Sequence, residues 1–137
     1  MALHIKELSV TNGTKILFDT CAVIKLLDKQ YDLSSLGISV DEARFFTSVI
    51  VRMELLSKKQ MTSNEERSIL NFLDYLAVIP LGEKIEKKAI ELRRFTNLKL
   101  PDSIVAATSI ILDAILITDD EYLLNLSLPG LQTQHIS

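Results

Sequence analysis

Short apolar runs alternate along this chain with longer segments in which apolar residues recur every three or four positions. Runs of the first kind predict buried strands, and they occupy residues 15–19, 44–50, 77–80, 114–118 and 131–136. Segments of the second kind predict helices, and they lie between these runs. Strands that alternate with helices favour a mostly parallel sheet covered by helices on both faces. The pattern therefore predicts an α/β domain, a three-layer α/β/α sandwich around about five short strands.

Capping residues predict where several helices begin. Ser48 is suited to cap the helix after the second strand, and Ser63 with Glu66 three residues later forms a predicted capping box. Pro101 fits the first position of the helix that leads into the most apolar run, residues 104–117. This run is too short to span a bilayer, which takes about 20 apolar residues, so it predicts a core segment.

Composition limits the classes of protein to which the chain can belong. Its 137 residues, 47% of them hydrophobic, suit one domain over residues 15–137, preceded by an N-terminal extension over residues 1–14. A net charge of −3 argues against a protein that coats nucleic acid. The first residues contain no apolar export segment, and the single Cys21 cannot form an internal disulfide. We therefore expect a cytoplasmic protein with no membrane association.

Several carboxylates directly follow predicted strands or begin a helix. Asp19 follows the first strand, Asp119 and Asp120 follow the strand over residues 114–118, and Asp102 lies in the first turn of a helix. Ligands of open α/β sheets bind outside the carboxyl ends of the strands, so these acids are aimed at one edge of the sheet. Taken singly, each acid is more simply explained as a helix cap or a solvated surface residue. Taken together, they favour a shared site.

Converging carboxylates need a counter-charge, because like charges at close range cannot all stay ionised. The candidate ligands are carboxylates, with the hydroxyls of Thr20 and Thr118 nearby, and oxygen donors suit Mg²⁺ or Mn²⁺ better than zinc. The only two histidines, His4 and His135, lie near the chain ends, which argues against a zinc site built from Cys and His. The residues thus predict a hard divalent cation.

Four short motifs each contain one acid of the predicted site. They are Asp19-Thr20 in LFDTCAVI, Glu54 in SVIVRMELL, Asp102 in KLPDSIVAATS, and Thr118 to Asp120 in LITDDEYL. In order and spacing these motifs resemble those of the PIN-domain ribonucleases, and most closely the VapC-like toxins of type II toxin–antitoxin modules. The resemblance covers the chain from Lys15 to its end. The chain departs from the family pattern in its long N-terminal segment, in Cys21 after Asp-Thr, and in the extra acid Asp119.

The resemblance implies a metal-dependent endoribonuclease that hydrolyses RNA phosphodiester bonds with one or two Mg²⁺ or Mn²⁺ ions. It also implies a homodimer that acts as a toxin and is inhibited by a cognate antitoxin protein. The roles that it implies are of three kinds: metal ligation or water activation by Asp19, Glu54, Asp102 and Asp120; orientation of ligands or waters by Thr20, Thr118 and Asp119; and contact with the RNA backbone by Arg52, Lys58 and Arg93.

Two other classes of function stay open. A non-catalytic PIN-like domain that binds RNA or a protein partner would not need the metal or the carboxylates, so metal dependence discriminates between the two. A phosphatase or phosphoacceptor domain also places acids at strand ends. The haloacid-dehalogenase type of phosphatase requires Asp-x-Asp after the first strand, and here Cys21 takes the second of these places.

The neighbours Asp119 and Asp120 are expected to play different roles. Alternate residues of an extended chain share a face, so Thr118 and Asp120 are expected to point one way and Asp119 the other. The Thr-x-Asp resemblance also selects Asp120 as the fourth acid. Asp119 is then expected to cap the short helix that begins near Glu121.

Overall fold

A single five-stranded sheet forms the centre of the molecule. The computed structural model describes residues 13–28, 37 and 40–136. Its strands are β1 (Thr14–Phe18), β2 (Ala43–Ser48), β3 (Ala77–Ile79), β4 (Ile115–Thr118) and β5 (Gln132–His135). They are arranged in the order β3-β2-β1-β4-β5, and every neighbouring pair is parallel. The predicted α/β class is confirmed, and the sheet is wholly parallel.

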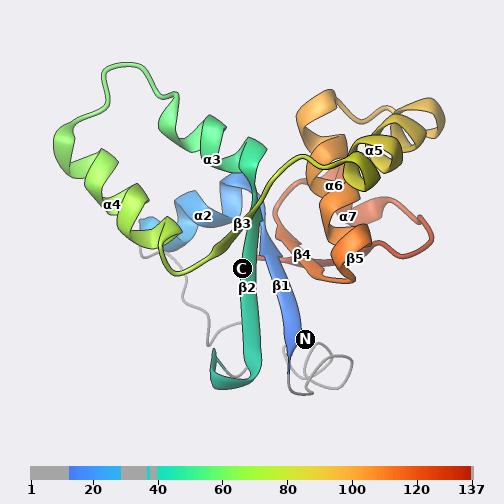
Figure 1. Cartoon of the computed structure of the whole chain (residues 1–137), viewed down its shortest axis with the longest axis horizontal. Coiled ribbons are helices and arrows are strands. Elements are labelled where there is room, and N and C mark those ends of the chain that lie inside the picture. The colour runs from blue at the N-terminus through green and yellow to red at the C-terminus, as the bar shows by residue number, and fades with distance from the viewer. Residues whose placement is uncertain (1–12, 29–36, 38–39, 137) are drawn as a thin grey trace.

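Helices cover both faces of this sheet. They are α2 (Thr20–Leu27), α3 (Val49–Leu56), α4 (Ser63–Leu73), α5 (Glu83–Phe95), α6 (Leu100–Leu112) and α7 (Glu121–Asn125), with a 3-10 turn, η2 (Val40–Glu42), ahead of β2. Figure 1 shows α2, α3 and α4 on one side of the sheet and α5, α6 and α7 on the other. This arrangement is the expected three-layer α/β/α sandwich. None of the described helices is both long enough and apolar enough to cross a membrane.

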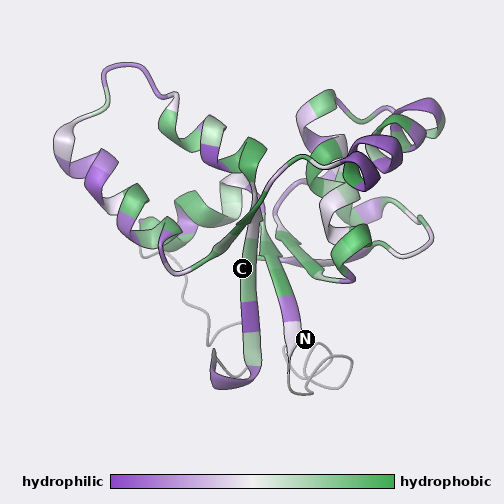
Figure 2. Ribbon diagram, viewed as in Figure 1, coloured by the Kyte–Doolittle hydropathy of each residue, from purple (hydrophilic) through white to green (hydrophobic). Residues whose placement is uncertain are grey.

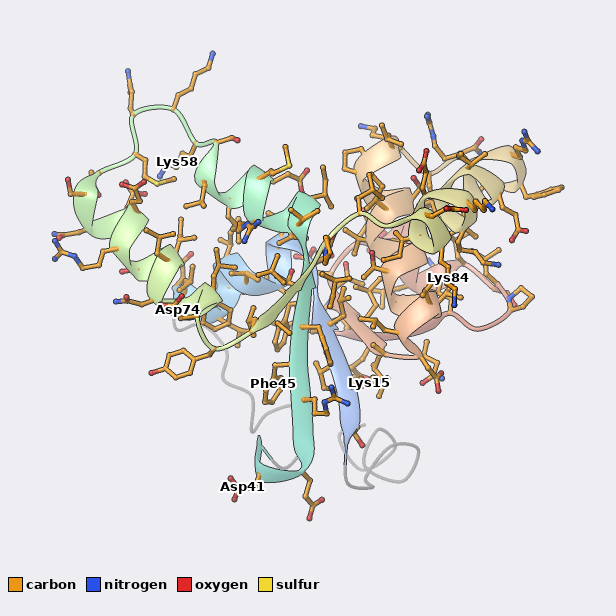
Figure 3. All side chains as sticks on the ribbon, viewed as in Figure 1. Lys15, Asp41, Phe45, Lys58, Asp74 and Lys84 are labelled. Atoms are coloured by element: carbon orange, nitrogen blue, oxygen red, sulfur yellow. The ribbon has the colours of Figure 1, made fainter. Side chains whose placement is uncertain are left out.

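The two central strands and one helix supply most of the deeply buried side chains. In β1, Ile16, Leu17 and Phe18 have no exposed surface, because helices cover the sheet on both sides. Residues 103–109 of α6 are all buried, so this helix is surrounded by protein over most of its length. Figure 2 shows the upper parts of the central strands in green, for hydrophobic residues, and Figure 3 shows side chains filling the space between sheet and helices. This packing holds the ends of β1 and β4 in place.

One of the two predicted helix caps is confirmed, and the other is formed one residue earlier than predicted. Ser48 caps α3 as predicted, accepting a hydrogen bond from the Ile50 amide at 3.1 Å. The predicted capping box at Ser63 is wrong, because Thr62 and Glu65 form it, each side chain bonding the other's backbone amide at 3.1 Å. The segment contains both Thr-x-x-Glu and Ser-x-x-Glu, so the motif alone could not select the frame.

Two other expectations concern the start of α6 and the N-terminal segment. Helix α6 begins at Leu100, so Pro101 occupies its second position rather than its first. Pro is still tolerated there, because amides of the first turn have no partner within the helix. The expected N-terminal extension over residues 1–14 lies almost wholly outside the described residues.

Candidate active site

The carboxyl ends of β1 and β4 lie side by side at the centre of the sheet. From β1 the chain continues to β2 on one side, and from β4 it continues to β5 on the other. Such a reversal leaves a crevice above the strand ends, where open α/β sheets bind their ligands. Asp19 directly follows β1, and Asp119 and Asp120 directly follow β4. The topology therefore brings together acids that are about a hundred residues apart in the sequence.

Asp19 is the most deeply placed of these acids, with 8% of its surface exposed. It caps α2, and its Oδ1 accepts hydrogen bonds from the Ala22 amide at 2.9 Å and the Cys21 thiol at 2.8 Å. Burial raises the pKa of Asp19, and the hydrogen bonds oppose this shift only in part. Just before it, the Thr47 hydroxyl donates to the Phe18 carbonyl at 2.7 Å, which fixes the end of β1. Capping and membership of the site are therefore compatible roles for Asp19.

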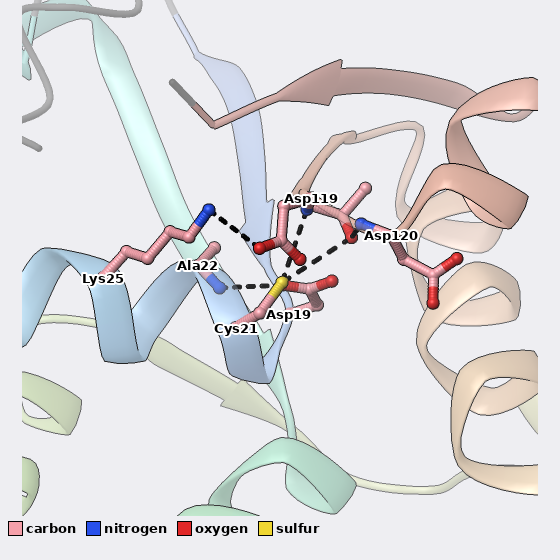
Figure 4. A network of polar contacts seen from close by, with 7 residues as sticks. Asp19, Cys21, Ala22, Lys25, Asp119 and Asp120 are labelled. Carbon is pink, nitrogen blue, oxygen red and sulfur yellow. Dashed lines mark hydrogen bonds and ion pairs between the residues drawn. The ribbon is translucent and has the colours of Figure 1, made fainter.

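Asp119 and Asp120 lie in different surroundings. Asp120 caps α7, since its Oδ1 accepts from the Leu123 amide at 3.0 Å, while its own amide donates to Thr118 Oγ1 at 3.0 Å. Asp119 instead pairs with Lys25 of α2 at 2.8 Å (Figure 4). Hydrogen bonding to Cys21 and this ion pair lower the pKa of Asp119. The expectation that Asp119 caps the helix is wrong, because a cap reaches the third amide of the helix, and Asp120 is the residue at that spacing.

Helices supply the remaining two acids. Glu54, on α3, is exposed, and its Oε1 accepts a hydrogen bond from the Thr20 hydroxyl at 2.6 Å. Asp102, in the first turn of α6, is partly buried. Burial raises the pKa of Asp102, and the negative charges of Asp120, Glu54 and Asp19 raise it further. Asp19, Glu54 and Asp120 therefore all lie within electrostatic reach of Asp102.

The donor set fits a hard divalent cation by its chemistry. Its atoms are carboxylate oxygens, and their mutual repulsion is relieved only in part by Lys99, whose charge lowers the pKa of Asp102. Within the part of the chain that the structure describes, no three side chains of the His, Cys, Asp or Glu type are placed to hold a metal ion as they stand. Metal binding by this set would therefore need a change in side-chain orientation.

Of the predicted RNA-contacting residues, Arg52 lies on α3, Lys58 in the loop that follows α3, and Arg93 on α5. Arg52 and Lys58 lie on either side of Glu54 in the sequence, and both are exposed. Lys58 forms an ion pair with Glu65, which lowers the pKa of that carboxyl to about 2. Arg93, on α5, donates from Nε to the Leu98 carbonyl at 3.3 Å. Of the three, Arg52 is nearest to a site acid in sequence, two residues before Glu54.

Sequence reasoning missed Lys25 and assigned no role to Cys21. Both lie on α2, four residues apart and so on one face, and both contact the segment that follows β4. Burial, followed by the neighbouring charge of Asp19, raises the pKa of the Cys21 thiol, so the thiol stays protonated and can donate. The four-residue spacing of Cys21 and Lys25 indicates that they share a face of the helix, but the sequence does not reveal which segment packs against this face.

Comparison with known proteins identifies both a family and a set of similar folds. The family model described as PIN domain matches residues 16–127. The solved structure of VapBC2 from Rickettsia felis bound to a DNA fragment from their promoter superposes with a TM-score of 0.76 at 20% identity, covering 90% of this chain and 100% of that one. VapBC-1 from nontypeable Haemophilus influenzae gives 0.75 at 19% identity, covering 89% and 98%. No curated protein matches the sequence.

A further solved structure, a toxin–antitoxin complex from Klebsiella pneumoniae, is more similar in sequence. It shares 27% identity with this chain and has a TM-score of 0.67, over 85% of this chain and 94% of that one. Nearly the whole described domain is therefore common to these proteins.

Proposed function

This chain belongs to the PIN-domain family, and from that premise we propose that it is a metal-dependent endoribonuclease serving as the toxin of a toxin–antitoxin pair. One observation carries the proposal: Asp19 follows β1, Asp120 follows the adjacent strand β4, and Glu54 accepts a hydrogen bond from Thr20 beside Asp19, so acids from distant segments gather at the switch point of the sheet. The charges of these three acids also raise the pKa of Asp102, after the larger effect of burial. A site that only stabilised the fold would gain nothing from such repulsion. The likeness to a toxin–antitoxin complex at 27% identity supports the toxin role.

The chain's own side chains prepare this site in two ways. Asp19, Glu54, Asp102 and Asp120 would hold one or two Mg²⁺ or Mn²⁺ ions, which when bound neutralise charge on the scissile phosphate and acidify a water. Thr20 holds the Glu54 carboxylate, so that rotation about its side-chain bonds is restricted. Thr118 holds the backbone of Asp120 through its amide. Arg52, Lys58 and Arg93 would bind the phosphates of the RNA.

Purified protein is expected to cleave single-stranded RNA in Mg²⁺ or Mn²⁺ and to stop cleaving in excess EDTA. Gel analysis of end-labelled RNA measures both, and re-addition of Mn²⁺ after EDTA should restore cleavage. Cleavage that continues undiminished in EDTA would contradict the proposed mechanism. Metal-independent RNA binding without cleavage would instead support the non-catalytic alternative.

We also propose that the antitoxin occupies a groove between α2, α3 and α4. The groove has a volume of about 620 Å³, begins at Thr20 and Glu54 of the site, and is floored by apolar side chains that include Ile24, Leu55 and Ile69. Ile24 is 46% exposed although it is apolar. An apolar floor suits an amphipathic segment, and the acids at one end attract a guanidinium, which pairs bidentately with carboxylate.

An antitoxin tail with Arg or Lys is therefore expected to inhibit cleavage by binding from this groove into the site. Ile24→Ser should weaken binding of the protein encoded beside this chain by at least about tenfold, as the loss of one well-packed anchor typically does, and should leave RNA cleavage intact. Leu70→Ser, an exposed apolar residue of α4 outside the groove, is the control. An antitoxin that binds far from Asp19 and Asp102 would contradict the inhibition model.

A homodimer is the last part of the proposal. Exposed apolar side chains on α5, on α6 and ahead of α5 surround a second groove of about 640 Å³, namely Leu81, Ile90 and Leu100. Contiguous apolar surface of this kind marks interaction sites. Sedimentation velocity is expected to show a dimer for the wild type and a monomer for Ile90→Glu, with Ile111→Glu on the adjacent helix as the control. A wild-type monomer at micromolar concentration would contradict this part.

A further inference from the structure

The end of α2 is tied to the segment after β4 by an ion pair. Lys25 Nζ lies 2.8 Å from Asp119 Oδ2, and the two side chains are only 24% and 31% exposed. The pair therefore connects the helix that follows β1 to the turn that follows β4, at the carboxyl ends of these two neighbouring strands. Figure 4 shows Lys25 reaching from α2 toward Asp119 above Cys21 and Asp19.

Cys21 lies one helical turn before Lys25, on the same side of α2. Its sulfur is 2.8 Å from Asp19 Oδ1, to which the thiol donates, and 3.4 Å from the amide of Asp119, from which it accepts. Thr118 Oγ1 is 3.8 Å away. The thiol thus joins the acid at the end of β1 to the backbone at the end of β4.

We propose that Lys25 and Asp119, acting through Cys21, are positioning residues that hold Asp19 in the orientation it needs to bind the metal. The inference rests on the proposed metal-dependent function and adds Lys25 and Cys21, to which the family resemblance gives no role, and it states the contacts through which Asp119 acts. Lys25 holds the Asp119 carboxylate, which keeps the Asp119 amide directed at the sulfur. The sulfur in turn holds Asp19 Oδ1 together with the Ala22 amide.

The three positioning residues Lys25, Asp119 and Cys21, which we call the brace, are expected to contribute little to the stability of the fold. Ala22 and Val23 already anchor α2 in the core with no exposed surface, and Asp19 caps the helix. Partly exposed ion pairs contribute little to stability. Removing the brace should therefore change the behaviour of Asp19 more than the stability of the protein.

The test measures Mn²⁺ binding to the full chain by electron paramagnetic resonance of the free ion. Lys25→Met is expected to raise the dissociation constant for Mn²⁺ by about 10–100-fold, the usual cost of losing a partner that orients a ligand. Lys25→Arg should keep the wild-type value, because it retains the charge. Cleavage by Lys25→Met should recover at high Mn²⁺ concentration, so that the metal requirement changes and the maximal rate does not.

Two further variants show whether the three residues act as one unit. Cys21→Ala should weaken Mn²⁺ binding without removing either charge of the ion pair. The double variant Lys25→Met with Asp119→Asn should bind Mn²⁺ no more weakly than the worse single variant, because effects within one network are not additive. Lys87→Met, which breaks an exposed ion pair with Glu83 on α5, is the matched control and should bind Mn²⁺ like the wild type.

Thermal unfolding in EDTA separates positioning from a purely structural role. Unfolding temperatures of Lys25→Met and Lys87→Met are expected to agree. A Lys25→Met protein that binds Mn²⁺ as tightly as the wild type overturns the inference, whether or not it unfolds at a lower temperature. A wild-type chain that binds no Mn²⁺ overturns the proposed function, and the inference with it.

Discussion

Asp102→Asn is expected to reduce RNA cleavage by more than about 100-fold, while the metal-free protein becomes more stable at neutral pH. The loss should exceed the 10–100-fold cost of removing a residue that only orients a ligand, because a proposed ligand itself loses its charge. The gain in stability follows first from the burial of the Asp102 carboxylate and then from the repulsion that Asp120, Glu54 and Asp19 exert on it. The position in the first turn of α6 favours a negative charge by about 0.3–1 kcal/mol. The raised pKa shows that burial and repulsion outweigh this effect.

The stability gain has a defined dependence on pH. The folded-state pKa of Asp102 lies above its ordinary value of 3.8, so folding favours the protonated carboxyl. The contribution of this carboxyl to stability is fully present below that value and is lost as pH rises through the folded pKa. Asn cannot ionise, so the stability of Asp102→Asn relative to the wild type should increase between pH 4 and pH 7. Urea unfolding in EDTA at these two pH values measures the difference.

The control for this experiment lies at the other end of the same helix. Asp113 follows α6 in the left-handed conformation, with φ of 58°, which Asn also adopts readily. Asp113→Asn is therefore expected to keep cleavage and to show no comparable gain between pH 4 and pH 7. An Asp102→Asn protein that is less stable than the wild type at pH 7 in EDTA would show that the four acids do not repel one another as described.

Asp120→Asn is expected to lose cleavage by more than about 100-fold without any loss in the free energy of unfolding. The carboxylate is a proposed ligand, whereas the cap of α7 needs only a side-chain oxygen, which Asn supplies as well as Asp does. Asp120→Ala removes both functions, so it should lose cleavage and also about 1 kcal/mol of stability. RNA cleavage and urea unfolding of the two variants separate the catalytic role from the capping role.

Variants of the two neighbouring residues provide the controls. Glu121→Gln changes an exposed acid in the first turn of α7 and should cleave RNA like the wild type. Asp119→Asn should lose cleavage at low Mn²⁺ and recover it at high Mn²⁺, whereas Asp120→Asn should not recover. An active Asp120→Asn beside an Asp119→Asn that stays inactive at every Mn²⁺ concentration would reverse the assignment of the fourth acid.

Local patterns in the sequence determined the fold class and the order of its elements. The five runs became β1 to β5, because short runs between helical segments pair as parallel strands. The neighbouring strands β1 and β4 are almost wholly buried, whereas the edge strands β3 and β5 are partly exposed. Ser48 identified the start of α3 because a hydroxyl cap depends only on amides a few residues away. Where two frames satisfied the same local rule, as at Thr62 and Ser63, the sequence could not choose between them.

What only the tertiary structure decided is how the acids relate to one another and to their neighbours. Alternation along β4 predicted that Asp119 and Asp120 would differ, but not that Lys25 on α2 would pair with one of them, since the two residues are 94 positions apart. The repulsion at Asp102 likewise arises from charges on three other segments. Local propensity acts over a few residues, whereas electrostatic contacts at the switch point depend on which strands become neighbours. The sequence alone therefore determined which residue types follow each strand, and strand order decided which of them meet.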